Sequence, residues 1–197
     1  MRVIIFFILF LFIAKFSNGQ NFNAGLLAGL STSQVDGDHL GGYHKVGIKA
    51  GGFVSRKISR QMRMQFEIEF IQKGSRKPLD NFGFFYLMRL NYIEVPLLLN
   101  YSIGKKWSAE AGGSIATLLS SLEEDPAGPI TNAPPFHKMD YLVCAGGNYF
   151  LTSHLVFNVR FSYSLTTIRP KNQDYDYFYS VNGQYNRVLA FCLAWQF

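Results

Sequence analysis

A strict two-residue alternation between Gln61 and Lys73 constrains the fold of this chain more than any other feature. The apolar side chains Met62, Met64, Phe66, Ile68 and Phe70 share one parity, and Arg63, Gln65, Glu67 and Glu69 share the other. Successive side chains of a β-strand point to opposite faces, so the segment predicts a strand with one apolar and one polar face. A strand of a soluble β-sandwich has the same pattern, so this segment alone leaves the class of protein open.

The same alternation recurs along the chain and predicts eight strands. They cover residues 22–34, 45–56, 61–73, 87–102, 107–120, 137–150, 154–166 and 184–197. Long connections (35–44, 74–86, 121–136 and 167–183) alternate with short ones (57–60, 103–106 and 151–153). An antiparallel meander with turns at one end and loops at the other has this spacing, as outer-membrane barrels do. The predicted fold is all-β, an eight-stranded antiparallel up-and-down transmembrane β-barrel.

The chemistry of the two strand faces separates a membrane barrel from a soluble one. Large apolar residues point inward in a soluble barrel, whereas in a membrane barrel they face lipid and polar residues fill the lumen. Here the polar parity carries charges of both signs, namely Lys49, Arg63, Glu67, Glu69, Glu94, Glu110 and Arg160. Buried charges are tolerated when they are paired, and eight strands enclose a space that side chains can fill. We therefore expect a lumen plugged by salt bridges, with Phe66, Phe161 and Phe191 facing outward.

The N-terminus has the form of a secretory signal peptide. Arg2 precedes an apolar run, Val3–Ala14, which is shorter than the ~20 residues that a membrane-spanning helix needs. Small residues at the −3 and −1 positions predict cleavage before Gln20, so residues 1–19 would be the signal and 20–197 the barrel domain. A transmembrane anchor is the alternative. Removing Arg2 and Lys15 changes the formal charge from +6 to +4, which favours anionic lipid headgroups. No basic run or basic helix indicates a nucleic-acid partner.

Several local features carry structural expectations. Cys144 and Cys192 are separated by one whole predicted strand, too far for a disulfide, so we expect two free, buried thiols. The pairs Gly51-Gly52, Gly112-Gly113 and Gly146-Gly147 should let the sheet bend or admit a bulky lumen neighbour. Pro96 inside a strand predicts a bulge there. Aromatic girdles are expected from Trp107, Tyr149, Phe150 and Trp195 at the turn end, and from Phe84, Phe85, Tyr86, Tyr163 and Tyr185 at the loop end.

Several short stretches resemble the PorT-like outer-membrane β-barrel family of Bacteroidetes-type bacteria. These are Ala28-Gly29-Leu30, Ser33-Gln34, Asp36-Gly37-Asp38, Gly42-Tyr43, Lys45-Val46-Gly47 and, most specifically, Tyr92-Ile93-Glu94-Val95-Pro96-Leu97-Leu98. The resemblance covers residues 20–197 and implies an eight-stranded outer-membrane barrel, in some members associated with protein secretion to the cell surface. It carries over no catalytic position. The terminal Phe197 resembles the aromatic end that the barrel-assembly machinery recognises.

Residues that could carry chemistry are few. The first long loop holds Asp36, Asp38, His39 and His44, which could form a metal or protease site, but the full calcium-loop spacing is absent and turn chemistry explains Asp-Gly. A barrel enzyme acting on lipid would need a serine beside a histidine. The candidates are His39, His44, His137 and His154 with Ser31 or Ser164, and no spacing singles out a triad; His154 should face the periplasm.

The segment Asp174–Tyr179 is rich in tyrosine. It could contact a protein or glycan, or it could extend the aromatic girdle, and the sequence favours neither. We therefore expect a structural or interaction barrel, perhaps accessory to secretion or surface assembly, that is not an enzyme. We assign no catalytic, metal or cofactor-binding residue and no cofactor. Expected partners are outer-membrane lipid, the barrel-assembly machinery, and secretion or surface proteins. An outer-membrane enzyme acting on lipid or peptide, and a narrow pore or small-ligand carrier, are the alternatives.

Overall fold

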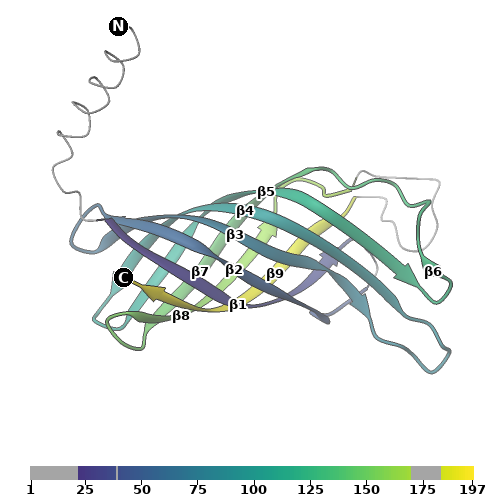
Figure 1. Ribbon diagram of the computed structural model, residues 1–197, viewed down its shortest axis with the longest axis horizontal. Helices are drawn as coiled ribbons and strands as arrows, with labels where there is room; N and C mark the ends of the chain where they lie inside the picture. Colours follow the sequence, from purple (N-terminus) through teal and green to yellow (C-terminus); the bar gives the residue numbers. More distant parts are fainter. Residues whose placement is uncertain (1–21, 39, 170–182) are drawn as a thin grey trace, which may run out of the picture.

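The computed structural model describes residues 22–38, 40–169 and 183–197, and these residues form a β-barrel (Figure 1). The predicted signal peptide, His39 and the tyrosine-rich segment 174–179 lie outside the described residues. The strands are β1 (Phe22–Asp36), β2 (Lys45–Lys57), β3 (Met62–Lys77), β4 (Tyr86–Ile103), β5 (Trp107–Asp125), β6 (Gly128–Pro129), β7 (Met139–Phe150), β8 (Leu155–Ser164) and β9 (Tyr185–Gln196). Among the described residues, no helix is long and apolar enough to span a membrane.

Eight antiparallel strands close into a ring, as predicted. Each strand pairs with its neighbours in the chain, and β1 pairs with β9 to close the barrel. The ninth strand, β6, was not predicted. Its two residues pair only with the end of β5, where Asp125 faces Gly128. It therefore folds one loop back and takes no part in the ring.

The two ends of the barrel differ as the connection lengths predicted. Residues 58–61, 104–106 and 151–154 make short turns at one end, where the C-terminus also lies, and the long loops meet at the other (Figure 1). Three adjacent strands are far longer than the ~9–11 residues that cross a membrane. β3 has 16 residues, β4 has 18 and β5 has 19. They project beyond the other strands at the loop end.

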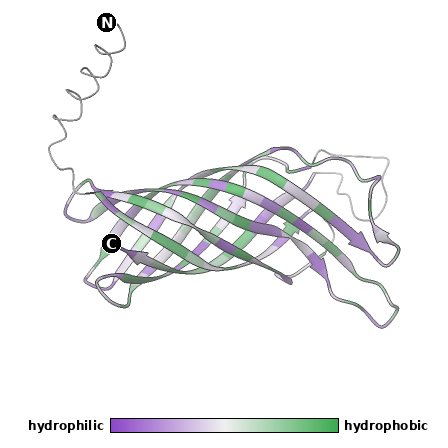
Figure 2. Ribbon diagram, in the orientation of Figure 1, coloured by the Kyte–Doolittle hydropathy of each residue, from purple (hydrophilic) through white to green (hydrophobic). Residues whose placement is uncertain are grey.

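The side chains face as a membrane barrel requires. Phe66, Phe161 and Phe191 are 41%, 37% and 40% exposed on the outer wall, whereas Glu67 and Arg160 are 0% and 3% exposed. The alternation of apolar and polar bands along each strand is visible in Figure 2. The orientation on which the membrane prediction depends is therefore confirmed.

This pattern inverts where the long strands leave the lipid band. On β4, Ile93 faces outward among apolar neighbours, but the next outward residues toward the loops are Asn91 and Arg89. The inward residues change in the opposite sense, from Glu94 to the buried Leu90 and Met88. Three polar residues mark one level of the wall, because Gln72 pairs with Asn91 and Asn91 pairs with Ser120. We take this level as the loop-side edge of the membrane, since the wall beyond it has the inside-apolar pattern of a soluble barrel.

Pro96 does not form the predicted bulge. Its pairing with Ser114 keeps the register of β4 and β5, and the register shifts instead between Asn91 and Tyr92. On the other side, the ladder between β3 and β4 has no pairs between Phe66 and Glu69. Proline has no backbone N–H to donate, so a gap in the ladder accommodates it without an extra residue. The bulge lies at the level where the wall leaves the lipid.

In two of the three predicted pairs, the first glycine admits a lumen neighbour, whereas Gly112 lies against the backbone of Leu97 and Leu98. A Cβ atom at Gly51 would lie 2.7 Å from Cβ of Glu69, and one at Gly146 would lie 2.9 Å from Oε1 of Glu110. The second glycine of each pair has ordinary space around it, with no atom nearer than 3.6 Å. Gly51 and Gly146 therefore make room for the buried carboxylates of Glu69 and Glu110.

The predicted free thiols are confirmed, and the predicted aromatic girdles are confirmed only in part. Cys144 and Cys192 are free and buried, on strands β7 and β9 with β8 between them. The rings of Trp107 and Tyr149 contact each other in a tilted arrangement with centroids 4.6 Å apart, and Tyr163 stacks against Tyr185. Three members of the predicted girdles are wrong, because Tyr86 is fully buried inside the barrel, Phe150 lines its interior and Phe84 packs against the interior apolar cluster. Tyr86 and Phe150 lie on the inward parity of their strands.

Candidate functional site

Arg160 crosses the lumen and holds the centre of an ionic layer. From β8 it donates two hydrogen bonds, of 2.7 and 2.8 Å, to the carboxylate of Glu67 on β3. Its Nε donates a third, of 2.6 Å, to Glu110 on β5. Asn148 and Asn158 also donate to Glu110, at 3.0 and 2.9 Å. A guanidinium can satisfy two carboxylates in this way because its five donors lie in a fixed planar fork.

Two lysines extend the layer along the barrel axis. Lys49 lies 2.9 Å from Glu69, and Lys73 lies 2.7 Å from Glu94 and 3.7 Å from Asp140. The predicted salt-bridge network is thus present. Of its predicted members, Arg63 is the exception, since it lies at the turn-end mouth and bonds Gln196. Asp140, Lys73 and the asparagines were not singled out from the sequence, although each has the inward parity.

Beyond the ionic layer, the loop-end half of the lumen is filled by apolar and aromatic side chains. Its buried members are Val35, Ile71, Tyr86, Met88, Leu90, Tyr92, Ala116, Leu142, Ile168 and Val188. Arg169 covers the loop-side end of this apolar cluster. It forms a salt bridge with the buried Glu123, which also accepts a hydrogen bond from Tyr86, and its guanidinium lies 3.8 Å from the ring centroid of Phe136. The described lumen is thus occluded by charge pairs and then by an apolar core.

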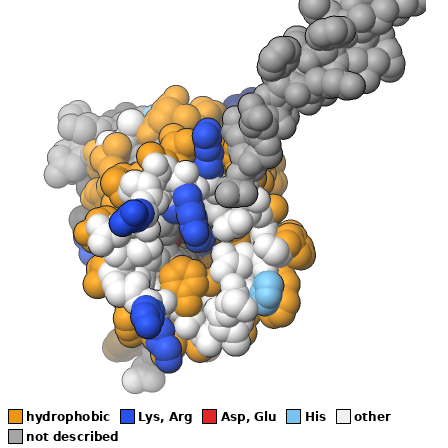
Figure 3. All heavy atoms as spheres, turned by 90° about the vertical axis from the view of Figure 1, so that its left-hand side faces the viewer, with side chains coloured by type: hydrophobic (Ala, Val, Ile, Leu, Met, Phe, Trp, Pro, Cys, Tyr) orange, Lys and Arg blue, Asp and Glu red, His pale blue; other side chains and the backbone are white. Residues whose placement is uncertain are grey.

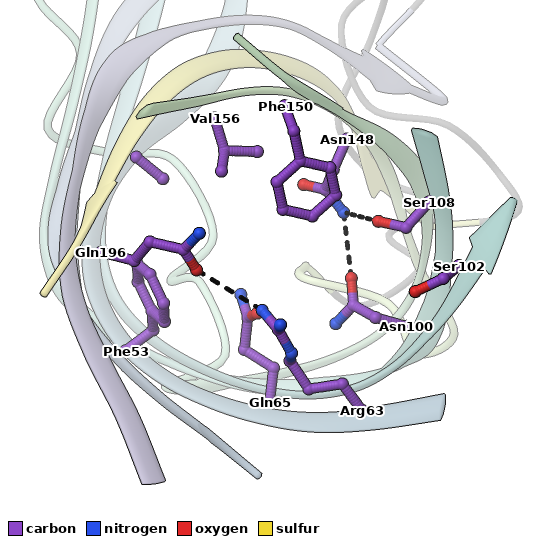
Figure 4. A pocket seen from close by; sticks show the side chains of 11 residues that line it. Phe53, Arg63, Gln65, Asn100, Ser102, Ser108, Asn148, Phe150, Val156 and Gln196 are labelled. Carbon is purple, nitrogen blue, oxygen red and sulfur yellow. Dashed lines mark hydrogen bonds between the residues drawn. The ribbon is translucent and has the colours of Figure 1, made fainter. Parts of the chain in front are cut away.

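The turn-end mouth holds a small polar cavity of about 40 Å³ (Figure 4). Asn148 donates to Asn100 and Ser108 at one side, and Arg63 donates to Gln196 at the other. Phe53 and Phe150 point into the same space. A volume of this size holds about three water molecules and no larger ligand.

The hairpin between β3 and β4 presents the most exposed apolar side chains of the loop end. Its tip is ordered by Asp80, whose carboxylate accepts the backbone N–H groups of Phe82 and Phe84 at 3.0 and 2.9 Å and lies 3.1 Å from Lys77. The N–H of Phe84, and then the lysine, hold the pKa of Asp80 below its usual value. Phe82 is 96% exposed and Leu79 69% exposed. An ordered tip with protruding apolar side chains is a feature of contact surfaces.

The first long loop does not assemble a metal site from its described residues. Asp36 accepts hydrogen bonds from Gln34 and Arg187, at 2.9 and 2.7 Å. Asp38 is fully buried and accepts the N–H of Leu40, and its burial raises the pKa of that carboxyl to about 6. His44 is exposed. Within residues 22–38, 40–169 and 183–197, no three His, Cys, Asp or Glu side chains are placed to hold a metal ion.

Of the predicted serine and histidine candidates, His137, His154, Ser31 and Ser164 are engaged elsewhere, whereas His44 is exposed and His39 lies outside the described residues. His137 contacts the carbonyl of Thr167, and His154 lies in a short turn, as predicted, against the carbonyl of Gln196. Ser31 donates to the carbonyl of Gln72, and Ser164 accepts the N–H of Asn186. None of the hydrogen bonds between described residues joins a serine to a histidine.

Comparisons with known proteins agree with this architecture. The Neisserial surface protein NspA superimposes with a TM-score of 0.57 at 12% identity, over 88% of this chain and 97% of that one. Ail of Yersinia pestis, solved with the heparin analogue sucrose octasulfate, gives a TM-score of 0.51 at 10% identity, over 89% of this chain and 99% of that one. At such identities the likeness concerns the fold alone. Among curated proteins, none matches the sequence.

A family model settles the broader relationship. The family described as "Outer membrane protein beta-barrel domain" matches residues 16–169, which include the ionic layer and the long strands β3 to β5. The match covers most of the chain, and the eight-stranded ring with lipid-facing apolar side chains is the architecture that such a family has. The chain therefore belongs to the outer membrane protein β-barrel domain family.

Proposed function

We propose that this chain is a non-conducting outer-membrane barrel that acts through contacts at the cell surface, as an accessory to secretion or surface assembly in the manner of PorT-like proteins. The observation that carries the proposal is the occlusion of the lumen by the Arg160–Glu67–Glu110 network. A pore needs a continuous aqueous path, whereas these side chains join opposite walls of the barrel. Function is then left to the outer surfaces.

The projecting strands β3, β4 and β5 supply a surface for such contacts. They extend past the level of Asn91, and the β3–β4 tip presents Leu79 and Phe82. Outer-membrane barrels place their long loops outside the cell, so this tip would face the external medium. Phe82 is the residue that we expect to contact a partner protein.

We also propose that the chain has no enzymatic activity, because the candidates Ser31, Ser164, His137 and His154 are engaged with other groups rather than with one another. The PorT-like assignment within the family rests on the Tyr92–Leu98 stretch. That stretch supplies the buried side chains of Tyr92 and Glu94 to the lumen, which supports a scaffold role rather than a catalytic one.

Two measurements test the proposal. In planar bilayers, the purified barrel should show no stable open channel where a porin control conducts, and a steady conductance would refute the plugged lumen. In intact outer membranes, a photo-crosslinking phenylalanine derivative at position 82 should capture a protein of the cell surface. The matched control is the same derivative at Ile103, which is 55% exposed at the opposite end. Equal capture from the two positions, or none from position 82, would count against the contact surface.

A further inference from the structure

The turn end of the barrel carries cationic charge without any acidic residue. Residues 22–26, 53–66, 98–109, 147–158 and 192–197 make up this end and contain six lysines and arginines but no aspartate or glutamate. The basic residues are Arg56, Lys57, Arg60, Arg63, Lys105 and Lys106. Figure 3, which faces this end, shows lysine and arginine side chains spread around the mouth. The outer-membrane orientation places this end at the inner leaflet.

One of these residues, Arg56, lies directly beside an apolar groove on the outer wall. The groove has a volume of about 430 Å³ and is walled by Leu26, Val54, Phe66, Ile68 and Phe197. Gly52 lies at its floor, where β1 and β3 flank β2. Phe197 is held at the turn end of the groove by a hydrogen bond from its N–H to the carbonyl of Ala24.

The strand registers place the groove and the charge on consecutive outward rungs. Gly52 pairs with Leu26 and Ile68, forming the first rung. Val54 pairs with Ala24 and Phe66, forming the second. Arg56 pairs with Phe22 and Met64, forming the third. Rungs on one face are two residues apart, or about 7 Å. The small residues Gly52 and Ala24 leave the groove open, and the guanidinium of Arg56 lies at its turn-side end.

Arg56 has no acidic partner among the described residues. Its guanidinium lies 5.9 Å from the ring centroid of Phe22, which is itself 56% exposed. A cation next to an aromatic ring at the border of an apolar band suits an amphiphile with a negative headgroup, because the ring and the groove accept the chain and the guanidinium accepts the phosphate.

We propose that this face of β1, β2 and β3 is a binding site for an anionic phospholipid of the inner leaflet, with one acyl chain in the groove over Gly52 and the phosphate at Arg56. A second copy of the chain is a poorer occupant. A two-fold contact would bring Arg56 toward its own counterpart, and the outward face of these strands within the lipid band offers no carboxylate to compensate. The site is independent of the surface-contact function proposed for the opposite end.

The test is native mass spectrometry of the purified barrel with phosphatidylglycerol or phosphatidylcholine added. We expect the wild type to retain phosphatidylglycerol in preference. Arg56→Gln should reduce that retention roughly five-fold, toward the phosphatidylcholine value, because one basic residue at an anionic surface contributes about this factor. Gly52→Leu should reduce retention of both lipids. A leucine side chain can start there without strain, since a Cβ at Gly52 has its nearest neighbour at 3.6 Å.

Matched controls lie on the other wall. Gly113→Leu also adds a side chain at an outward glycine, with the nearest atom at 3.6 Å, and Lys105→Gln removes a charge from a different turn. Both should retain lipid as the wild type does. If Gly52→Leu does not fold, as judged by heat-modifiable gel migration, Ala24→Leu fills the same groove from β1.

Three results would overturn the site. The first is equal retention of the two lipids by the wild type. The second is a loss with Lys105→Gln as large as that with Arg56→Gln, which would indicate diffuse attraction to the whole end. The third is a dimer in the wild type that Gly52→Leu abolishes, which would make a second copy the occupant.

Discussion

Replacing Arg160 by methionine should destabilise the barrel strongly, because it leaves two buried carboxylates without their main partner. Glu67 would lose two charge-assisted hydrogen bonds and Glu110 one. Removing one member of a buried ion pair costs about 3–5 kcal/mol, most of it from the charge left behind. Methionine retains most of the side-chain volume, so the loss reports on charge rather than on a cavity. We expect Arg160→Met to lower the free energy of unfolding by about that amount.

The two carboxylates should differ in how far neutralising them restores stability. Glu110 keeps the amide donors of Asn148 and Asn158, whereas Glu67 keeps only that of Gln65. Adding Glu67→Gln to Arg160→Met should therefore recover about 2 kcal/mol, and adding Glu110→Gln about 1 kcal/mol.

Denaturant-induced unfolding of the barrel in lipid vesicles, followed by the fluorescence of the outward-facing Trp107 and Trp195, measures these differences. Heat-modifiable gel migration provides an independent readout of the folded fraction. The reasoning would be refuted by an Arg160→Met variant within about 1 kcal/mol of the wild type, since surface substitutions already reach about half of that. Recovery that is greater with Glu110→Gln than with Glu67→Gln would refute the ranking of the two carboxylates.

Three further predictions concern the loop end, the glycines and the thiols. Folding raises the pKa of Asp38 from 3.8 to about 6, so the contribution of this carboxyl to stability is greatest below pH 4, falls as the pH rises to 6 and does not change further above that pH. Asp38→Asn should remove this pH dependence and stabilise the protein at pH 8 by about 2–3 kcal/mol, measured by unfolding at a series of pH values. Gly146→Ala should cost about 1–3 kcal/mol of unfolding free energy because its Cβ would lie 2.4 Å from the carbonyl oxygen of Val159, whereas Gly147→Ala should stay within about 0.5 kcal/mol; similar losses would contradict the assigned faces. Cys144 and Cys192 should resist a thiol reagent until the barrel unfolds, and reactivity in the folded state or a shift on reduction would contradict two buried, unlinked thiols.

Period-two alternation was enough to predict the strands, the ring and the direction of the side chains. It defines which residues share a face, and the presence of charge on one face indicates that this face is enclosed. Glu67, Glu69, Glu94, Glu110 and Arg160 could therefore be assigned to the lumen. The alternation does not say which lumen residues meet. The bond between Arg160 and Glu67 joins residues on opposite walls, and it depends on the stagger of all the intervening strands.

Other errors arose because residues were assigned by their distance along the strand rather than by their face. Tyr86 was assigned to a girdle by its distance from the strand centre, but its parity directs it inward. Phe150 was misplaced for the same reason. Asn91 and Arg89 carry a signal that could have located the edge, since polar residues appear there on the apolar parity of β4. Pro96 was read as a bulge without considering that a ladder can omit a pair.

The inversion at Asn91 explains how the barrel can carry an ordered surface away from the membrane. Below this level, lipid surrounds the wall and charges fill the centre; above it, water surrounds the wall and Tyr86, Met88 and Leu90 fill the centre. Each half thus buries the side chains that its own surroundings disfavour. The six residues from Tyr86 to Asn91 span five steps and extend β4 by about 17 Å along the strand. An apolar core fills this extension from within, so the hairpin tip at Phe82 is held by packed strands. The same core closes the loop end of the lumen, so the side chains that make the tip rigid also make the barrel impermeable.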